Sequence, residues 1–302
     1  MNFLDSFSSV AIFGSVARGD NDAFSDRDIL AISEKPTAQR NIKAIHENGF
    51  SPSIYTWNEL ESLSRHNALF LLHLKLESKI IKDDQNRLSG FLTKIEPSND
   101  YSLALKQSVA LAGLTSGVPA TRALSLWAAD VLAVALRNYL VAFAAEKRKY
   151  IFAHHSLIDF ADSLFELTPE ARETLLDLRR WKSIYRGKGE IVPSEPPFGD
   201  QIELAQSAFS CISGIKLATP RLSVREFGQK LMDNRDASEP WYHSVRRYEG
   251  AYRATPRDYF TKKQEKVITQ QISSPSCYSS DGQVSWQKLR YLISAAHLRS
   301  LH

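Results

Sequence analysis

Short apolar runs alternate with amphipathic segments over the first hundred residues. A run of about five apolar residues bounded by glycine or polar residues is typical of a buried strand, and apolar residues at i, i+3 and i+4 are typical of a helix. Strands are predicted at 9–13, 28–32, 53–57 and 79–82, and helices at 36–48, 59–65 and 68–77. Asn58 is expected to cap the second of these helices. The order β-β-α-β-α-α-β predicts a small mixed sheet covered by helices.

From about residue 101 to residue 215 the pattern is helical throughout. Helices are predicted at 101–113, 122–147, 155–165, 169–185 and 200–215, with a proline- and glycine-rich loop at 187–199. The helix 122–147 is apolar around most of its circumference, which predicts a place at the centre of a bundle. The predicted fold class is therefore α+β, with a small mixed β-sheet domain followed by an all-α helical bundle.

The last segment is basic and aromatic. Residues 221–302 carry 14 Lys and Arg against 8 Asp and Glu, whereas residues 1–220 carry 24 against 26. Helices are predicted at 224–232, 262–271 and 285–298, and a serine-rich loop at 273–282. We expect the aromatic residues to pack on the bundle. The alternative is a nucleic-acid surface, in which Trp241 or Tyr248 stacks on bases and the cations attract phosphates.

Composition excludes several classes of protein. The only two cysteines, Cys211 and Cys277, cannot build a disulfide framework or a four-cysteine zinc site, and they fit a reducing compartment. The start of the chain lacks the basic and long apolar regions of a secretory signal. The most apolar stretch, 123–145, contains Asp130 and Arg137 near its middle, which a bilayer span tolerates poorly. We expect a cytoplasmic protein without a membrane segment.

The strongest chemical signal lies between the first two predicted strands. Gly14-Ser15 is followed after ten residues by Asp26-Arg27-Asp28, with an apolar run on each side. Residues two apart in a strand face the same side, so Asp26 and Asp28 are expected to present two carboxylates together, with Arg27 on the other face.

This pattern predicts a site for a metal ion and a polyphosphate. Two adjacent carboxylates repel unless a cation sits between them, and Mg²⁺ is commonly bound by one or two carboxylates plus phosphate oxygens. Gly14 lets the backbone approach a phosphate closely, and Ser15 can donate its hydroxyl. If Ser15 opens a helix, the first N–H groups of that helix favour the same anion.

The stretch VAIFGSVARGDNDAFSDRDILAIS, residues 10–33, resembles the signature of the DNA-polymerase-β-like nucleotidyltransferase superfamily. Ala17-Arg18-Gly19 and Ser25 are similar to the bacterial minimal nucleotidyltransferase branch, as is ALFLLHLKLESKIIKDD at residues 68–84. A helical domain after the sheet resembles the layout of kanamycin nucleotidyltransferase and its relatives. The resemblance is specific over 10–33 and looser to about residue 84.

The resemblance implies transfer of a nucleoside monophosphate from a nucleoside triphosphate, with ATP as the expected donor, to a hydroxyl on a small molecule, a protein or an RNA. Asp26 and Asp28 would be the catalytic residues that hold Mg²⁺. Gly14, Ser15 and Arg18 would bind the nucleotide. Mg²⁺ held by the paired aspartates would polarise the α-phosphate and assist the leaving pyrophosphate.

One position departs from the family pattern. The superfamily usually adds a third carboxylate on a later strand, and the corresponding stretch 51–55 here holds no Asp or Glu. Two readings stay open: a Mg²⁺-dependent enzyme, or a catalytically weak nucleotide-binding regulator or antitoxin-like partner.

Two further groups of side chains are weaker candidates. The cations of the helix end 179–186 could face an anion or simply be solvated. His73 and Glu77 lie one helical turn apart, a spacing that favours a structural pair. The predicted domains are a nucleotidyltransferase domain at 1–98, a helical bundle at 99–215 and a basic C-terminal segment at 216–302.

Overall fold

The computed structural model describes residues 3–22, 25–35, 39–66, 68–187, 199–233, 239–272 and 283–300. The chain divides into two compact units, which are described separately here. Unit 1 contains residues 1–102 and 140–160, and unit 2 contains residues 103–139 and 161–302. The predicted loops at 187–199 and 273–282, together with Cys277, fall almost entirely outside the described residues.

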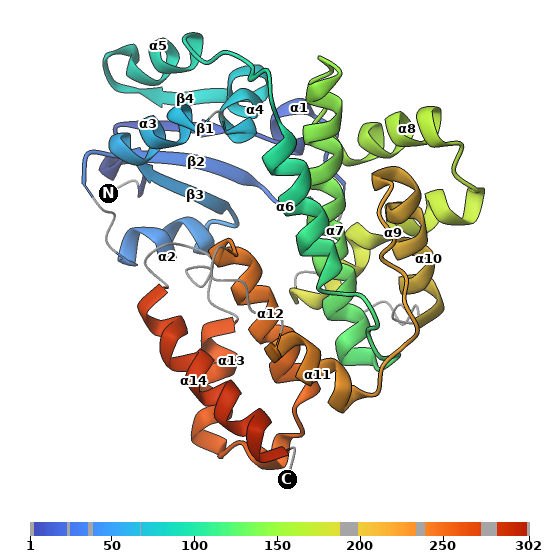
Figure 1. The fold of residues 1–302 in the computed structure, drawn as a ribbon. Coiled ribbons are helices and arrows are strands. Elements are labelled where there is room, and N and C mark those ends of the chain that lie inside the picture. Colours follow the sequence, from blue (N-terminus) through green and yellow to red (C-terminus); the bar gives the residue numbers. More distant parts are fainter. Residues whose placement is uncertain are drawn as a thin grey trace. The chain divides into compact units, whose positions relative to one another are not determined.

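Unit 1 is built on a four-stranded sheet with the strand order β3-β2-β1-β4 (Figure 1). Its strands are β1 (Ser9–Ile12), β2 (Asp28–Ser33), β3 (Ser51–Thr56) and β4 (Lys79–Asp83). β1 pairs antiparallel with β2 and with β4, whereas β2 and β3 run parallel. The parallel pair follows from the helix that connects β2 to β3. The predicted mixed sheet and the α+β fold class are confirmed.

Helices cover both faces of this sheet. η1 (Phe3–Ser6) precedes β1, and the helices that come after it in this part of the chain are α1 (Ser15–Arg18), α2 (Gln39–Glu47), α3 (Trp57–Arg65), α4 (Leu69–Glu77), η2 (Asp84–Asn86) and α5 (Arg87–Thr93). Leu30 and Ile32 of β2 face a core to which α3, α4 and α5 contribute, and Ile29 and Ala31 face a second core with Ile45 of α2. The alternation along β2 therefore decides which side chains meet which helix.

The start of α3 differs from the sequence prediction. The helix begins at Trp57, and its cap is Thr56 rather than Asn58. The Thr56 hydroxyl accepts from the Glu59 N–H, and the Glu59 carboxylate accepts from the Thr56 N–H, which makes a capping box. The reciprocal pair satisfies two end groups at once, so the cap lies two residues before Asn58 and the helix begins two residues before the predicted start at Glu59.

Every regular element of unit 2 in its described residues is a helix. Its elements are α6 (Ser102–Gly113), α7 (Arg122–Glu146), α8 (His154–Phe165), α9 (Pro169–Tyr185), α10 (Gly199–Ser213), α11 (Val224–Asp233), α12 (Trp241–Ala254), η3 (Arg257–Tyr259), α13 (Lys262–Ile272) and α14 (Gln283–Ser300). Helices α6, α7 and α8 cross a unit boundary, since unit 1 takes Ser102, the last turns of α7 and the first half of α8. The three predicted sequence domains therefore do not map one to one onto the two units, and their boundaries stay a prediction.

The basic C-terminal segment packs as part of unit 2. Tyr248 and Tyr252 of α12 are buried, and a Cβ added at Gly250 would lie 2.6 Å from the Trp127 ring of α7. The Trp127 indole donates to the Arg246 carbonyl at 3.1 Å. Because Tyr248 is buried, its ring is not available to stack on a base, and this observation favours the packing alternative.

Helix α7 is long and apolar enough to pass a test for a membrane span, by length and composition alone. Of its most apolar window, 78% is buried inside the structure. A core helix passes the same test, and Asp130 near its middle is fully buried and ion-paired. The finding is therefore weak evidence for a membrane and agrees with the predicted core helix.

Candidate functional site

Gly14 occupies the turn between β1 and α1, and its conformation suits glycine for two reasons. Its φ of +72° lies in the region that L side chains rarely adopt. A Cβ at this position would also lie 2.9 Å from Oδ2 of Asp28. Gly14 therefore forms the turn, and its lack of a side chain leaves room for the Asp28 carboxylate. Ser15 follows it as the first residue of the single-turn helix α1.

The pairing of β1 with β2 brings Gly14 close to Asp28. β1 and β2 are antiparallel, so the end of β1 meets the beginning of β2. The N–H of Phe13 donates to the carbonyl of Asp28 at 3.2 Å. Gly14 and Asp28 are thus neighbours in space although the loop 19–27 separates α1 from β2.

Asp26 lies just before β2 rather than within it, because the strand begins at Asp28. Both aspartates are half-buried, and Arg27 between them is exposed. The Arg27 guanidinium lies 4.4 Å from the centre of the Phe50 ring, which belongs to the α2 side of the sheet. Arg27 therefore points to the opposite face from Asp28, as the alternation predicts.

Arg18, the last residue of α1, is held by two carboxylates. Its Nε donates to Asp20 at 3.0 Å, and its Nη1 donates to Glu77 of α4 at 2.5 Å. Burial acts to lower the pKa of Arg18, but the hydrogen bonds to Asp20 and Glu77 outweigh it and raise this pKa. The guanidinium is therefore charged at all ordinary pH values.

The position where the superfamily usually has a third carboxylate holds serine. Ser51 and Ser53 of β3 pair in register with Asp28 and Leu30 of β2. Paired residues of parallel strands share a face, and Tyr55 further along β3 packs into the same core as Leu30. Two serines and a tyrosine, and no acid, thus occupy the β3 positions on the Asp28 face.

Among the described residues, no group of three or more His, Cys, Asp or Glu side chains is arranged to hold a metal ion. Asp26 and Asp28, two residues apart in sequence, are two carboxylates and not a complete protein cage. A pair still fits Mg²⁺, which usually keeps several waters and binds through one or two carboxylates and substrate phosphates. Oδ2 of Asp28 lies against Gly14, where a side chain would crowd it.

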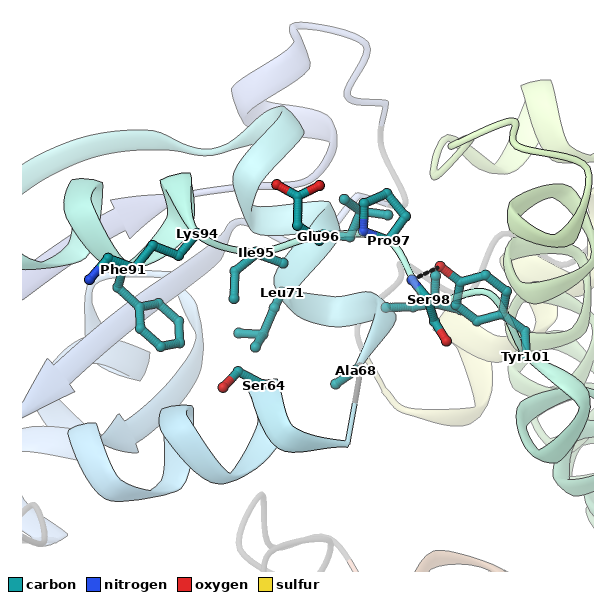
Figure 2. Close-up of a pocket in the computed structure, with 12 residues that line it drawn as sticks. Ser64, Ala68, Leu71, Phe91, Lys94, Ile95, Glu96, Pro97, Ser98 and Tyr101 are labelled. Carbon is teal, nitrogen blue, oxygen red and sulfur yellow. Dashed lines mark hydrogen bonds between the residues drawn. The ribbon is translucent and has the colours of Figure 1, made fainter.

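A cavity of about 320 Å³ lies elsewhere in unit 1, beside the first turn of α4 (Figure 2). Its lining is mostly apolar, and at one end the Tyr101 hydroxyl accepts from the Ser98 N–H at 3.0 Å. Glu77 ends the same helix, about 12 Å further along its axis at 1.5 Å per residue. The cavity contains none of the residues that the sequence predicted for a site.

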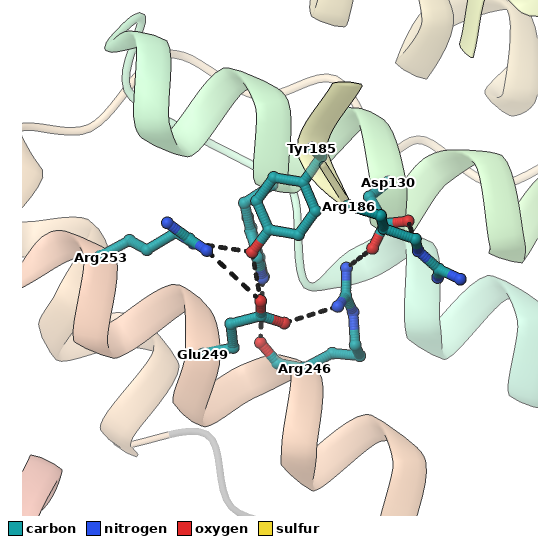
Figure 3. A network of polar contacts seen from close by, with 7 residues as sticks. Asp130, Tyr185, Arg186, Arg246, Glu249 and Arg253 are labelled. Carbon is teal, nitrogen blue, oxygen red and sulfur yellow. Dashed lines mark hydrogen bonds and ion pairs between the residues drawn. The ribbon is translucent and has the colours of Figure 1, made fainter. Parts of the chain in front are cut away.

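Unit 2 holds a second polar cluster, which joins α7, α9 and α12 (Figure 3). Asp130 of α7 accepts from Arg186 at 2.8 Å and from Arg246 of α12. Arg246 also donates to Glu249 at 2.5 Å. Asp130, Arg246 and Glu249 are all buried. We call these residues, with Tyr185 and Arg253, the buried network.

Tyr185 completes the buried network. Its hydroxyl donates to Glu249 and accepts from Arg253 at 2.7 Å. Burial, together with the neighbouring Glu249 charge, holds the pKa of Tyr185 well above 10, so the phenol stays protonated. Burial acts to raise the pKa of Asp130, but the charges of Arg246 and Arg186 outweigh it and lower this pKa.

One cation of the segment 179–186, Arg186, differs from both sequence interpretations. Arg186 belongs to the buried network, so it neither faces a ligand nor lies free in solvent. One signal in the sequence does indicate the network: Asp130 in the middle of an apolar helix needs a buried partner. The sequence pattern does not reveal that the partner is Arg246.

The comparisons with known proteins agree with the N-terminal motif. The family described as "Nucleotidyltransferase domain" matches residues 2–86, a range that contains β1 to β4 and both halves of the motif. No curated protein and no solved structure matches the chain significantly. Residues 2–86 belong to the DNA-polymerase-β-like nucleotidyltransferase superfamily.

Proposed function

We propose that this protein transfers a nucleoside monophosphate from a nucleoside triphosphate, with ATP as the expected donor, to a hydroxyl acceptor. Asp26 and Asp28 would hold Mg²⁺, and Gly14, Ser15 and Arg18 would bind the phosphates. The observation that carries the proposal is the approach of the Asp28 carboxylate to Gly14, because it joins a carboxylate to a side-chain-free stretch of backbone. Membership of the bacterial minimal branch remains a prediction.

In this proposal, Ser15, Arg18 and the bound metal ion each have a separate role. The Ser15 hydroxyl can donate to a phosphate oxygen, and the Arg18 guanidinium can neutralise negative charge on the triphosphate. Bound Mg²⁺ would supply charge stabilisation at the α-phosphate and the leaving pyrophosphate. Little covalent chemistry is asked of the protein, since phosphoryl-group transfer depends on positioning and on charge stabilisation.

The test follows the label from the nucleotide to its acceptor. Each α-labelled nucleoside triphosphate is incubated with the protein, Mg²⁺ and cell extract, and the labelled fraction is identified. Replacing Asp26 or Asp28 by Asn is expected to reduce transfer by at least about 100-fold, because either change removes a ligand from a two-carboxylate site. Transfer at the wild-type rate in both variants would refute the assignment.

The serines on β3 support a second candidate function, that of a nucleotide-binding regulator or antitoxin-like partner. Without an acid at Ser51 or Ser53, the site lacks the third carboxylate that could help to activate an acceptor hydroxyl. Such a protein would bind the triphosphate and gain thermal stability by mass action, but would release no pyrophosphate. Pyrophosphate release that is lost in the Asp28→Asn variant excludes this second candidate.

A further inference from the structure

A chain of side chains leads from the core of unit 1 to Arg18. The His73 ring stacks on the Phe152 ring with centroids 4.4 Å apart, and it meets the edge of Phe13 at 5.6 Å. His73 Nε2 lies 2.9 Å from Oε2 of Glu77. The same oxygen of Glu77 accepts from Arg18 at 2.5 Å. Glu77 is therefore fixed on one side by a buried ring and presents its charge to Arg18 on the other.

The two carboxylates that hold Arg18 differ in burial. The Glu77 side chain is 15% exposed, whereas the Asp20 side chain is 47% exposed, and that of Arg18 is 21% exposed. Burial alone would raise the pKa of Glu77, but the hydrogen bonds from His73 and Arg18 outweigh it and lower this pKa. Glu77 is thus an ionised, anchored partner. Asp20 lies in the loop after α1 and makes an exposed ion pair, which contributes little free energy.

Arg18 lies next to the Gly14 turn. Its N–H donates to the Gly14 carbonyl at 3.1 Å, so the two residues are one helical turn apart. The Asp28 carboxylate lies close to Gly14, since a Cβ at Gly14 would be 2.9 Å from Oδ2 of Asp28. Glu77 holds Arg18 at Nη1, whereas the exposed Asp20 pairs with Nε. A phosphate could therefore replace Asp20 as the hydrogen-bond acceptor at Nε.

We propose that Glu77 is a positioning residue that holds Arg18 for the phosphates of the nucleotide, and that Asp20 occupies the place on Arg18 which a phosphate takes on binding. The proposal rests on the proposed function, since it assumes that triphosphate binds beside Gly14. It assigns opposite roles to two acids on one arginine. Loss of the anchor weakens phosphate binding, and loss of the competitor strengthens it.

The experiment measures dissociation constants by calorimetry on the full-length chain, with Mg²⁺-ATP and with inorganic tripolyphosphate as the two probes. Glu77→Gln is expected to weaken both about tenfold, on the scale of a hydrogen bond to a charged group. Asp20→Asn is expected to tighten both about threefold, on the scale of an exposed ion pair. Glu47→Gln, which breaks an exposed pair with Lys43 on α2, is the matched control and should change neither.

A combined variant separates positioning from general support of the fold. In a chain that already carries Arg18→Gln, the further change Glu77→Gln should have no effect on either dissociation constant, because Glu77 acts through Arg18. An equal loss in both backgrounds would show a structural role and overturn the proposal. Asp20→Asn is an exposed change, so its tightening is measurable even if Glu77→Gln lowers stability.

The failures of the two proposals are distinguishable. If the wild-type protein binds neither probe, the proposed function fails and this inference fails with it. If the wild-type protein binds both probes while Asp20→Asn and Glu77→Gln leave the constants unchanged, the proposed function stands and only the roles of Asp20 and Glu77 are wrong.

Discussion

Asp28 and Asp130 are both aspartates on regular secondary structure, but the chain surrounds them differently. Asp130 lies in the middle of α7, fully buried, with two guanidinium groups on its two oxygens. Asp28 lies at the first residue of a strand, half-buried, with a second acid two residues before it and a glycine at its carboxylate. At Asp130 the protein itself supplies the positive counter-charge. At Asp28 the chain has two acids close together in sequence, an arrangement that suits a bound cation.

The contrast extends to the arginines. Arg246 in the buried network pairs with two buried acids, Asp130 and Glu249, which a ligand from outside the chain cannot readily replace. Arg18 is paired with one anchored and one exposed acid. A buried pair specifies how helices pack, whereas a partly exposed pair leaves one partner open to exchange. Burial of the partners thus separates a structural cluster from a candidate site.

The largest effect is expected for Asp130→Asn. This change removes one of the two acids that pair with the buried Arg246 and leaves only Glu249 of the two, and breaking a buried pair typically costs about 3–5 kcal/mol. The free energy of unfolding, measured by denaturant titration, should fall by that amount. The matched control is Asp200→Asn, which affects an exposed pair with Arg221 and should cost less than about 1 kcal/mol. Equal losses of unfolding free energy in the two variants would show that the buried ion pair contributes no more stability than the exposed one.

A smaller loss is expected for Tyr185→Phe. The hydroxyl makes hydrogen bonds to two charged groups, Glu249 and Arg253, and its removal should cost about 1.5–3 kcal/mol. Thermal and denaturant unfolding would measure the loss. Tyr291→Phe, at a side chain that is 73% exposed, serves as the control. A Tyr185→Phe protein as stable as the wild type would mean that the hydroxyl is not part of a stabilising network.

Acid should remove the contribution of Asp130. Its pKa is lowered in the folded state, so its ionised form adds stability above the ordinary pKa of about 3.8, and this stability is lost as the pH falls below that value. The gap in unfolding free energy between the wild type and Asp130→Asn should therefore narrow below about pH 4, by at most about 1.4 kcal/mol per pH unit. A gap that is constant down to pH 3 would contradict the assigned ion pair.

The smallest change in stability is expected for Asp28→Asn. Asp28 is half-buried and lies two residues after another acid, Asp26, so its neutralisation should relieve like-charge repulsion, and the free energy of unfolding should stay within about 0.5 kcal/mol of the wild type. The same variant is expected to lose Mg²⁺-dependent transfer. A large loss of stability would instead place Asp28 with Asp130 as a structural residue.

Much of unit 1 was predictable because its strands are local apolar runs. The strand predictions at residues 9–13 and 28–32 lie within one residue of β1 and β2. α12 was not predicted, since it carries the charged residues Arg246, Glu249 and Arg253, which pair with one another and with Asp130 of α7 and Tyr185 of α9. Residues far apart in sequence, such as Asp130 and Arg246, leave no local pattern. Pairing of this kind can be read only from the folded chain.

The closeness of Gly14 and Asp28 was predictable, because an antiparallel pair of strands joins the ends of one short loop. The hydrogen bond from Arg18 to Glu77 was harder to predict from the sequence. The spacing of His73 and Glu77 indicates that they can interact, but it does not indicate that Glu77 reaches α1. Nor does the sequence show that Phe152, almost eighty residues later, stacks on His73.

The order in which the chain visits its units constrains how this protein can be divided or recombined. Unit 1 takes residues 1–102, and the chain then contributes to unit 2 before returning to unit 1 for residues 140–160. A gene fragment that stops near residue 100 encodes the whole sheet but omits Phe152, the ring against which His73 rests. A single recombination breakpoint that transfers all of unit 1 therefore also transfers residues 103–139 of unit 2. Moving unit 1 alone to another protein requires two separate stretches of coding sequence.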